Sequence, residues 1–168
     1  NEAITIRRLL AHSSGLPAWR PYFVKLKGRD EYLAAIAAER PAYEPGTGFE
    51  YSDLGFMLLG WLLERALGGE LPTLARESVF EPLGMRSTAY RPADGGFAGL
   101  KSFAATEIGN GFERGMAMAY AEGRPVIGGN AGPFELSGAD IERFCWRNGV
   151  ISGQVHDSNC HYGLGGVS

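Results

Sequence analysis

Tyr51, Ser52 and Asp53 are consecutive side chains whose types and position could perform chemistry. A phenol can relay a proton, and a carboxylate can accept hydrogen bonds from a cation. An apolar run at residues 54–63 follows them and predicts a buried helix, which the glycine pair at 68–69 would end. Ser52 or Asp53 can cap the start of that helix. The sequence therefore predicts polar side chains held at the mouth of a rigid helix.

Other helices and loops must position this group. Apolar spacing and capping residues predict further helices, among them residues 4–10 with Thr5 as the cap, 30–40 with Asp30 as the cap, and 70–80. A loop rich in glycine and proline at residues 43–50 would deliver the chain to Tyr51. Residues 87–90 and 150–157 have the character of strands. The sequence therefore predicts a mainly α fold with minor β structure.

Length and composition limit the remaining possibilities. The 168 residues are enough for a core, and we expect a single domain over 1–168. Residues 108–135 hold seven glycines and little hydrophobic periodicity, which predicts a flexible insertion with little regular structure. The net charge of −3 and the lack of a basic run argue against nucleic acid as a partner. No apolar stretch is long enough to span a membrane, and no cofactor-binding motif is present.

Four short motifs follow one another along the chain. They are Leu10-Ala11-His12-Ser13-Ser14-Gly15-Leu16-Pro17, Tyr43-Glu44-Pro45-Gly46, Tyr51-Ser52-Asp53-Leu54-Gly55 and Phe80-Glu81-Pro82-Leu83-Gly84-Met85. Together they resemble the serine β-lactamase and penicillin-binding protein family, on the side of class C β-lactamases and related esterases. The resemblance covers residues 1–107 and returns at 149–168. It implies the helical lobe of that family's fold, without its α/β sheet domain.

The resemblance also implies a reaction. In the family a serine attacks a carbonyl, an acyl-serine forms, and water or an amine releases the acyl group. The tyrosine of a Tyr-x-Asn motif helps a lysine to activate that serine. Tyr51 matches this tyrosine, and Asp53 stands where the family has asparagine. The implied catalytic residues are therefore Tyr51 and Asp53, and the implied partner is a small acyl substrate such as a β-lactam, an ester or a peptide.

The nucleophile of this reaction is missing from the sequence. A Ser-x-x-Lys motif places the lysine one helical turn after the serine. The residues three positions before Lys25, Lys27 and Lys101 are tyrosine, valine and alanine. The family's Lys-Thr-Gly or His-Thr-Gly motif is absent as well. We therefore expect an internal fragment of a longer serine hydrolase, of the β-lactamase, esterase or peptidase type, that is inactive in isolation.

Two other functions stay open. One is a penicillin-binding-like module that has lost catalysis, because ionised Asp53 only accepts hydrogen bonds where asparagine also donates. The other is a small metal-binding domain, because His156, Asp157, Cys160 and His161 offer nitrogen, oxygen and sulfur ligands. No second cluster of ligands lies elsewhere in the sequence, so a polar turn is the simpler interpretation of these four residues.

His12 is a separate candidate because it belongs to one of the four motifs. It could act as a base. A histidine beside two serines and a glycine more often hydrogen-bonds the backbone of its own loop. We expect this structural role for His12.

Overall fold

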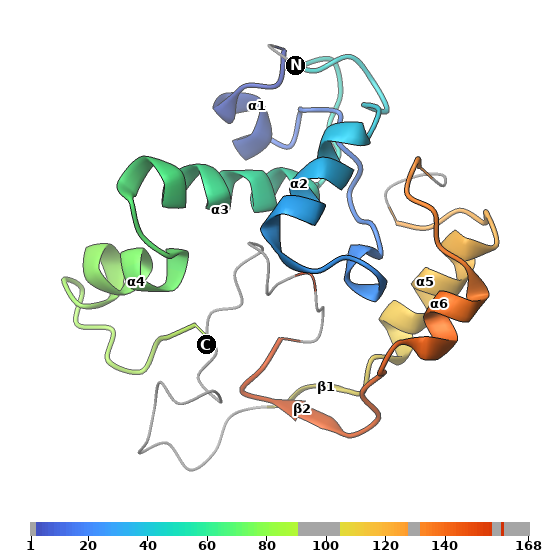
Figure 1. Cartoon of the computed structure of the whole chain (residues 1–168). Coiled ribbons are helices and arrows are strands. Elements are labelled where there is room, and N and C mark those ends of the chain that lie inside the picture. The colour runs from blue at the N-terminus through green and yellow to red at the C-terminus, as the bar shows by residue number, and fades with distance from the viewer. Residues whose placement is uncertain (1–2, 91–104, 128–131, 156–158, 160–168) are drawn as a thin grey trace. The chain divides into compact units, whose positions relative to one another are not determined.

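The computed structural model describes residues 3–90, 105–127, 132–155 and 159 (Figure 1). Its elements are, in order, α1 (Ile6–Leu10), the 3-10 helix η1 (Tyr22–Val24), α2 (Gly28–Ala38), α3 (Asp53–Leu67), α4 (Leu71–Ala75), the π-helical turn η2 (Arg76–Phe80), β1 (Ala105–Ile108), α5 (Gly111–Ala121), α6 (Gly138–Arg143) and β2 (Val150–Ser152). Helices dominate, and the described residues hold one two-stranded sheet. The prediction of a mainly α structure with minor β is confirmed.

The chain divides into two compact units. Unit 1 is Asn1–Leu59 with Phe112–Cys145, and unit 2 is Gly60–Gly111 with Trp146–Ser168. The helix α3 begins in unit 1 and ends in unit 2. The single domain expected from the length stays a prediction. Among the described helices, none has both the length and the apolar character needed to cross a lipid bilayer.

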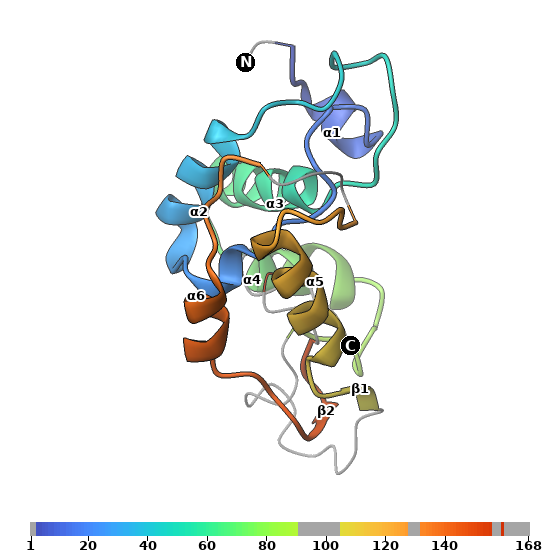
Figure 2. The same ribbon diagram turned by 90° about the vertical axis from the view of Figure 1, so that its right-hand side faces the viewer.

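The helix α1 is capped as the sequence predicts. The Arg8 backbone N–H donates to the Thr5 hydroxyl at 3.3 Å, so Thr5 caps the helix. Leu9 is buried, and its side chain lies against Gly55 in the first turn of α3. Figure 2 shows α1 beside the start of α3. Ile6 and Leu10 are exposed, although the sequence suggests an apolar stripe that includes them. A helix of one and a half turns presents only one side chain of that stripe to its neighbour.

The helix α2 starts two residues earlier than predicted. Lys27, rather than Asp30, precedes the helix, and its backbone N–H donates to the Glu31 carboxylate at 2.7 Å. Asp30 lies in the first turn, where its charge suits the positive end of the helix dipole. The helix ends at Ala38, and the chain is extended at Glu39. The predicted cap is wrong because an acidic side chain further along satisfies the backbone at the helix start.

The helix α3 ends at the predicted glycines. The Gly68 N–H donates to the Glu64 carbonyl at 2.9 Å, and Gly68 has a φ of 72°, which is the left-handed ending that glycine favours. Leu54 and Met57 are fully buried. The expected burial on all sides holds only in part, because three apolar side chains of the predicted run are exposed, namely Phe56, Leu62 and Leu63.

The core of unit 1 gathers side chains from five helices and from the segment that precedes α2. Its buried apolar members are Leu9, Leu16, Ala18, Trp19, Tyr22, Phe23, Val24, Tyr32, Ile36, Leu54, Met57, Leu59, Ala117, Ala119, Tyr120 and Ile141. Aromatic rings meet edge to face inside it: Tyr22 lies 5.5 Å from Tyr32 and 5.0 Å from Phe134, measured between ring centroids. The aromatic segment before α2 is therefore part of the core.

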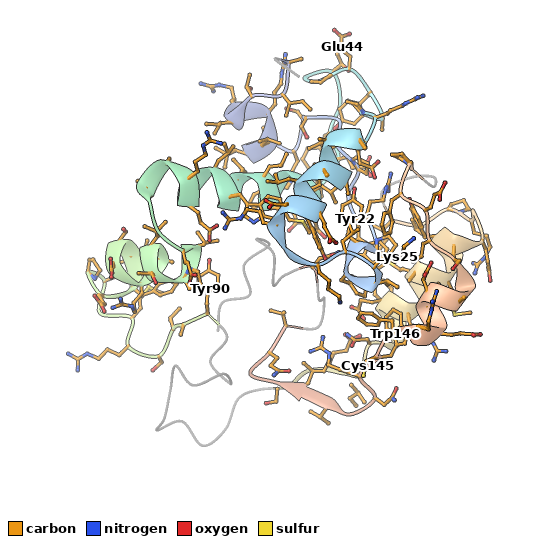
Figure 3. The ribbon with its side chains drawn as sticks, in the orientation of Figure 1. Tyr22, Lys25, Glu44, Tyr90, Cys145 and Trp146 are labelled. Atoms are coloured by element: carbon orange, nitrogen blue, oxygen red, sulfur yellow. The ribbon has the colours of Figure 1, made fainter. Side chains whose placement is uncertain are left out.

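A charged pair lies inside this core. The Arg20 guanidinium donates to both carboxylate oxygens of Glu39, at 3.0 Å from Nε and 3.2 Å from Nη2, and both side chains are almost fully buried. The Tyr22 hydroxyl donates to Glu39 Oε1 at 2.9 Å (Figure 3). Burial, reinforced by the Glu39 charge, raises the pKa of Tyr22 far above its usual range. The hydroxyl therefore stays protonated and remains a donor to the carboxylate.

Three further hydrogen bonds attach residues 132–135 to this core. The Tyr120 hydroxyl on α5 donates to the Phe134 carbonyl at 2.8 Å and accepts from the Gly132 N–H at 3.1 Å. The Lys25 ammonium donates to the Glu135 carbonyl at 2.9 Å (Figure 3). Burial raises the pKa of Tyr120, so this hydroxyl also stays protonated. Segments distant in sequence thus meet around Tyr22 and Tyr120.

Unit 2 contains the antiparallel sheet. β1 and β2 pair with Ile108 opposite Val150, and Ile151 is buried. The Asn110 side-chain oxygen accepts from Arg147 Nε at 2.9 Å just beyond the paired residues. The strand predicted at 150–157 is therefore present in its first three residues.

The helix predicted at 70–80 is present as α4 followed by η2. Pro72 lies in the first turn, where its missing N–H costs no helical hydrogen bond. The Met85 N–H donates to the Phe80 carbonyl at 2.8 Å, and Gly84 has a φ of 66°. The Pro-Leu-Gly-Met motif therefore closes this helix.

The expectation of little regular structure at 108–135 is wrong for residues 111–121, which form α5. Two glycines lower the intrinsic helix propensity of this segment. Ala117 and Tyr120 are buried, and tertiary packing of one helix face outweighs that propensity.

The mobility expected for 108–135 stays a prediction. Because the segment is rich in glycine, we expect amide hydrogen exchange at 108–127 to be faster than in the first two turns of α3. Exchange followed by NMR or mass spectrometry measures this. Equal protection in the two segments would contradict the prediction.

Removal of the Glu39 charge tests the buried pair. Glu39→Gln removes the charge that pairs with the buried Arg20 guanidinium, so we expect the free energy of unfolding to fall by about 3 kcal/mol. Urea denaturation followed by circular dichroism measures this change. Glu44→Gln removes the same charge from an exposed side chain (Figure 3) and should cost less than about 0.5 kcal/mol. If both variants lost the same free energy of unfolding, the buried pair would stabilise the fold no more than an exposed charge does.

Candidate active site

The turn at residues 12–18 holds the segment 50–53 by four hydrogen bonds. They run from Glu50 N–H to the His12 carbonyl (2.9 Å), from Ser52 N–H to His12 Nδ1 (3.0 Å), from the Ser52 hydroxyl to the Pro17 carbonyl (2.8 Å) and from Asp53 N–H to the Ala18 carbonyl (2.8 Å). Two of the four motifs seen in the sequence therefore form one structure.

Ser52 is the cap of α3. Its hydroxyl oxygen accepts from the Gly55 N–H at 3.1 Å and donates to the Pro17 carbonyl, and the residue is buried. The sequence allows either Ser52 or Asp53 as the cap, and the structure uses Ser52. A buried hydroxyl that already donates to a carbonyl is not placed to attack a substrate. Ser14 is equally buried, and its hydroxyl accepts from the backbone of Leu16.

His12 has a structural role, as expected, but its ring hydrogen-bonds the backbone of Ser52 and not that of its own loop. Its Nδ1 accepts from the Ser52 backbone, and its carbonyl oxygen accepts from Glu50 N–H and from the Tyr43 hydroxyl. The backbone φ of His12 is 52°, in the left-handed region that few residues other than glycine adopt. The surrounding hydrogen bonds hold His12 in this conformation.

The turn also depends on a glycine. Gly15 has a φ of 78°, and a Cβ at this position would lie 2.5 Å from the Tyr43 carbonyl oxygen and 2.9 Å from Pro41 Cβ. The Ala42 N–H donates to the Gly15 carbonyl at 2.8 Å. The loop before Tyr51 therefore packs directly on the turn, and a side chain at Gly15 would separate them.

Tyr51 and Asp53 lie on either side of the cap. Tyr51 precedes the helix and is 67% exposed, and its ring centroid lies 4.5 Å from that of His12. Asp53 is the first residue of α3 and is partly exposed. This agrees with the predicted position of both residues at the mouth of the helix. Their assignment as catalytic residues stays a prediction.

The predicted metal ligands His156, Asp157, Cys160 and His161 lie outside the described residues. Within the described ranges, no group of three or more His, Cys, Asp or Glu side chains is arranged to hold a metal ion. The metal-binding alternative therefore gains no support from the described part of the chain.

A cavity of about 550 Å³ lies in unit 2, between α4, η2 and the residues that follow them. It is lined by Phe80 and Tyr90, whose rings stack at 6.4 Å, and by Arg76, which pairs with Glu77 and Glu81. None of the predicted site residues lines this cavity. This cavity is therefore not part of the predicted site. The site around Tyr51 is built from the hydrogen-bonded turn of unit 1.

Comparison with known proteins decides the family. The sequence model of the beta-lactamase family matches residues 1–153 of the chain. The chain belongs to the β-lactamase family. The match includes the turn at 12–18 and the segment 50–53, so the candidate active site lies within the family region.

Curated proteins of this family show the same similarity. A putative D-alanyl-D-alanine carboxypeptidase of Escherichia coli (strain K12) is 31% identical over 172 residues, which is 98% of this chain and 34% of that protein. An N-acetylmuramyl-L-alanine amidase of Bacillus subtilis (strain 168) is 31% identical over 178 residues, which is 99% of this chain and 34% of that protein. The chain thus spans about a third of the length of these β-lactamase-family relatives.

Among solved structures, the chain is similar to a beta-lactamase/D-alanine carboxypeptidase from Yersinia pestis complexed with citrate. The two are 29% identical, the similarity covers 52% of this chain and 26% of that chain, and the TM-score is 0.46.

Sequence reasoning missed the pairing of His12 with Ser52. Both residues belong to motifs that were recognised, but the two motifs lie 40 residues apart. A serine before an apolar run signals a cap, and a Ser-Ser-Gly turn signals a loop. Neither local pattern predicts that the turn with His12 hydrogen-bonds the segment with Ser52.

Removal of the Ser52 hydroxyl tests how the segment is held. Ser52→Ala loses the helix cap and leaves the Pro17 carbonyl without its donor, so we expect the free energy of unfolding to fall by about 1–3 kcal/mol. Thermal or urea unfolding measures the loss. Ser78→Ala, at an exposed serine of η2, is the matched control and should be nearly neutral. If Ser52→Ala unfolded with the same free energy as the unaltered chain, the other hydrogen bonds would be enough to hold the segment 50–53.

Proposed function

We propose that the chain is the helical part of a larger serine hydrolase with the β-lactamase fold, and that Tyr51 takes part in proton transfer there. One observation carries this proposal. Tyr51 is an exposed phenol on a segment that four backbone and side-chain hydrogen bonds fix at the start of α3. An exposed group on a rigid support is suited to meet reacting groups that another segment brings.

The proposed reaction is acyl transfer. A serine of a Ser-x-x-Lys helix outside these 168 residues attacks the substrate carbonyl carbon, and its proton passes to the lysine with Tyr51 as a relay. The leaving amine or alcohol takes up that proton as the acyl-serine forms. Water then attacks the acyl-serine and releases the acid. Within this scheme the isolated chain is inactive, because it lacks the nucleophile.

The proposed substrates are amides or esters of small acyl groups, including peptides and β-lactams. Two relatives bear the names carboxypeptidase and amidase, which favours hydrolysis of an amide bond. A binding module without catalysis is the second candidate. Asp53 favours it, because a carboxylate cannot donate the hydrogen bond that asparagine would give to a substrate carbonyl.

Replacement of the phenol tests the proposed function. In a longer protein that joins these residues to a Ser-x-x-Lys helix, Tyr51→Phe should lower kcat by about 10²–10⁴-fold, the usual weight of a proton-transfer group. A chromogenic β-lactam and a nitrophenyl ester report turnover. Tyr90→Phe, at a tyrosine of unit 2, is the control and should keep its activity. The 168-residue chain alone should show no turnover and no acyl adduct. Full activity of Tyr51→Phe would overturn the proposal.

Asp53→Asn tests the departure from the family motif. The change restores a hydrogen-bond donor and removes a negative charge next to Tyr51. We expect faster turnover of amide substrates in the longer protein, by roughly tenfold to a hundredfold, which corresponds to about 1–3 kcal/mol. Steady-state kinetics with an amide and an ester measure this. Unchanged or slower turnover of both substrates would mean that Asp53 has a role of its own.

A further inference from the structure

We infer that His12 is the positioning residue for Tyr51, and that it acts as a neutral imidazole with its proton on Nε2. The imidazole would fix Tyr51 in two ways, through the backbone of Ser52 and through ring contact. The catalytic meaning of this arrangement rests on the proposed function of Tyr51. The tautomer and the hydrogen bond do not depend on that function.

The first step concerns the proton on His12. A backbone N–H can only donate, and the Ser52 N–H points to His12 Nδ1 at 3.0 Å. Nδ1 must therefore offer its lone pair, which places the single proton of the neutral ring on Nε2. A ring protonated on Nδ1 would face the Ser52 N–H with a second donor, and the hydrogen bond would be lost.

The second step concerns the aromatic side chains around the ring. The His12 ring stacks on Phe56 at a centroid distance of 4.9 Å and meets Tyr51 at 4.5 Å, with interplanar angles of 17° and 35°. The Phe49 ring approaches His12 edge-on at 5.9 Å. Tyr51 and Phe49 are 67% and 72% exposed, so burial does little to fix the Tyr51 ring. Contact with His12 supplies the restraint that burial does not.

The third step concerns the backbone of His12. Its φ of 52° lies in the left-handed region, which is strained for a residue other than glycine. Two donors to its carbonyl, from Glu50 and Tyr43, stabilise this conformation. Strained residues of this kind concentrate at functional sites because they aim a side chain. Here the strained residue aims Nδ1 at the backbone between Tyr51 and Asp53.

The experiment starts with the unaltered 168-residue chain. With ¹⁵N and ¹³C labelling, NMR distinguishes a ring nitrogen that carries a proton from one that offers a lone pair, and sequential backbone correlations in the unaltered chain assign His12. We expect unprotonated Nδ1, protonated Nε2 and a through-bond ¹⁵N–¹⁵N coupling between Ser52 N and His12 Nδ1 near neutral pH. Protonated Nδ1 would overturn the inference. This measurement needs no variant to fold.

Two variants separate the hydrogen bond from the ring. His12→Phe keeps an aromatic ring and removes the acceptor, so the Ser52 amide should exchange about tenfold faster. His12→Asn loses the ring but offers an oxygen near the place of Nδ1, so the Ser52 amide should keep its protection within about twofold. The Leu26 amide, which donates to the Tyr22 carbonyl at 2.8 Å, is the internal reference. Unchanged protection of Ser52 in His12→Phe would overturn the inference.

Kinetics in the longer protein separate this inference from the proposed function. If His12 positions Tyr51 through both the hydrogen bond and the ring contact, His12→Phe and His12→Asn each lose one of the two restraints, and each should lower kcat about tenfold with little change in KM. Full activity of Tyr51→Phe would refute the proposed function while the tautomer of His12 stands. Loss of activity in Tyr51→Phe without any loss in His12→Phe would refute the positioning role alone.

Discussion

The buried pair of Arg20 and Glu39 is the interaction on which unit 1 depends. Two charges taken out of water cost several kcal/mol each unless hydrogen bonds and mutual attraction offset the loss. The two bonds from Arg20 and the bond from Tyr22 satisfy the Glu39 carboxylate. A Cβ at Gly132 would lie 2.7 Å from Glu39 Oε2, so only bare backbone can approach the pair there. The pair therefore fixes how distant segments meet.

The candidate active site depends on the same constraint. Arg20 lies two residues after the turn at 12–18, and its guanidinium also donates to the Trp19 carbonyl at 2.9 Å. The end of the turn is thereby anchored in the core, with its carbonyls free to receive Ser52 and Asp53. The other end of the turn receives Ser52 through His12. A rigid core, a turn and a helix cap thus place Tyr51 on the surface.

Membership of the β-lactamase family gives this arrangement a chemical context. The chain carries Tyr51-Ser52-Asp53, which resembles the family's Tyr-x-Asn motif, and has no Ser-x-x-Lys. In the function we propose, this site relays a proton and another segment supplies the nucleophile. The aspartate at Asp53 distinguishes it from the Tyr-x-Asn pattern, because a carboxylate adds charge and removes a donor. The proposed division of catalytic groups between segments is consistent with a chain that spans about a third of its relatives' length.

The sequence by itself determined what short-range rules control. The cap at Thr5, the start of α3 at Asp53 and its end at Gly68 follow from side chains and glycines within one helical turn, and the family follows from four motifs. The helix α5 could not be predicted, because Tyr120 reaches Gly132 and Phe134 only once the core has formed. The hydrogen bond from Ser52 to His12 could not be predicted for the same reason. Contacts between segments 40 residues apart are decided by packing, which local patterns do not encode.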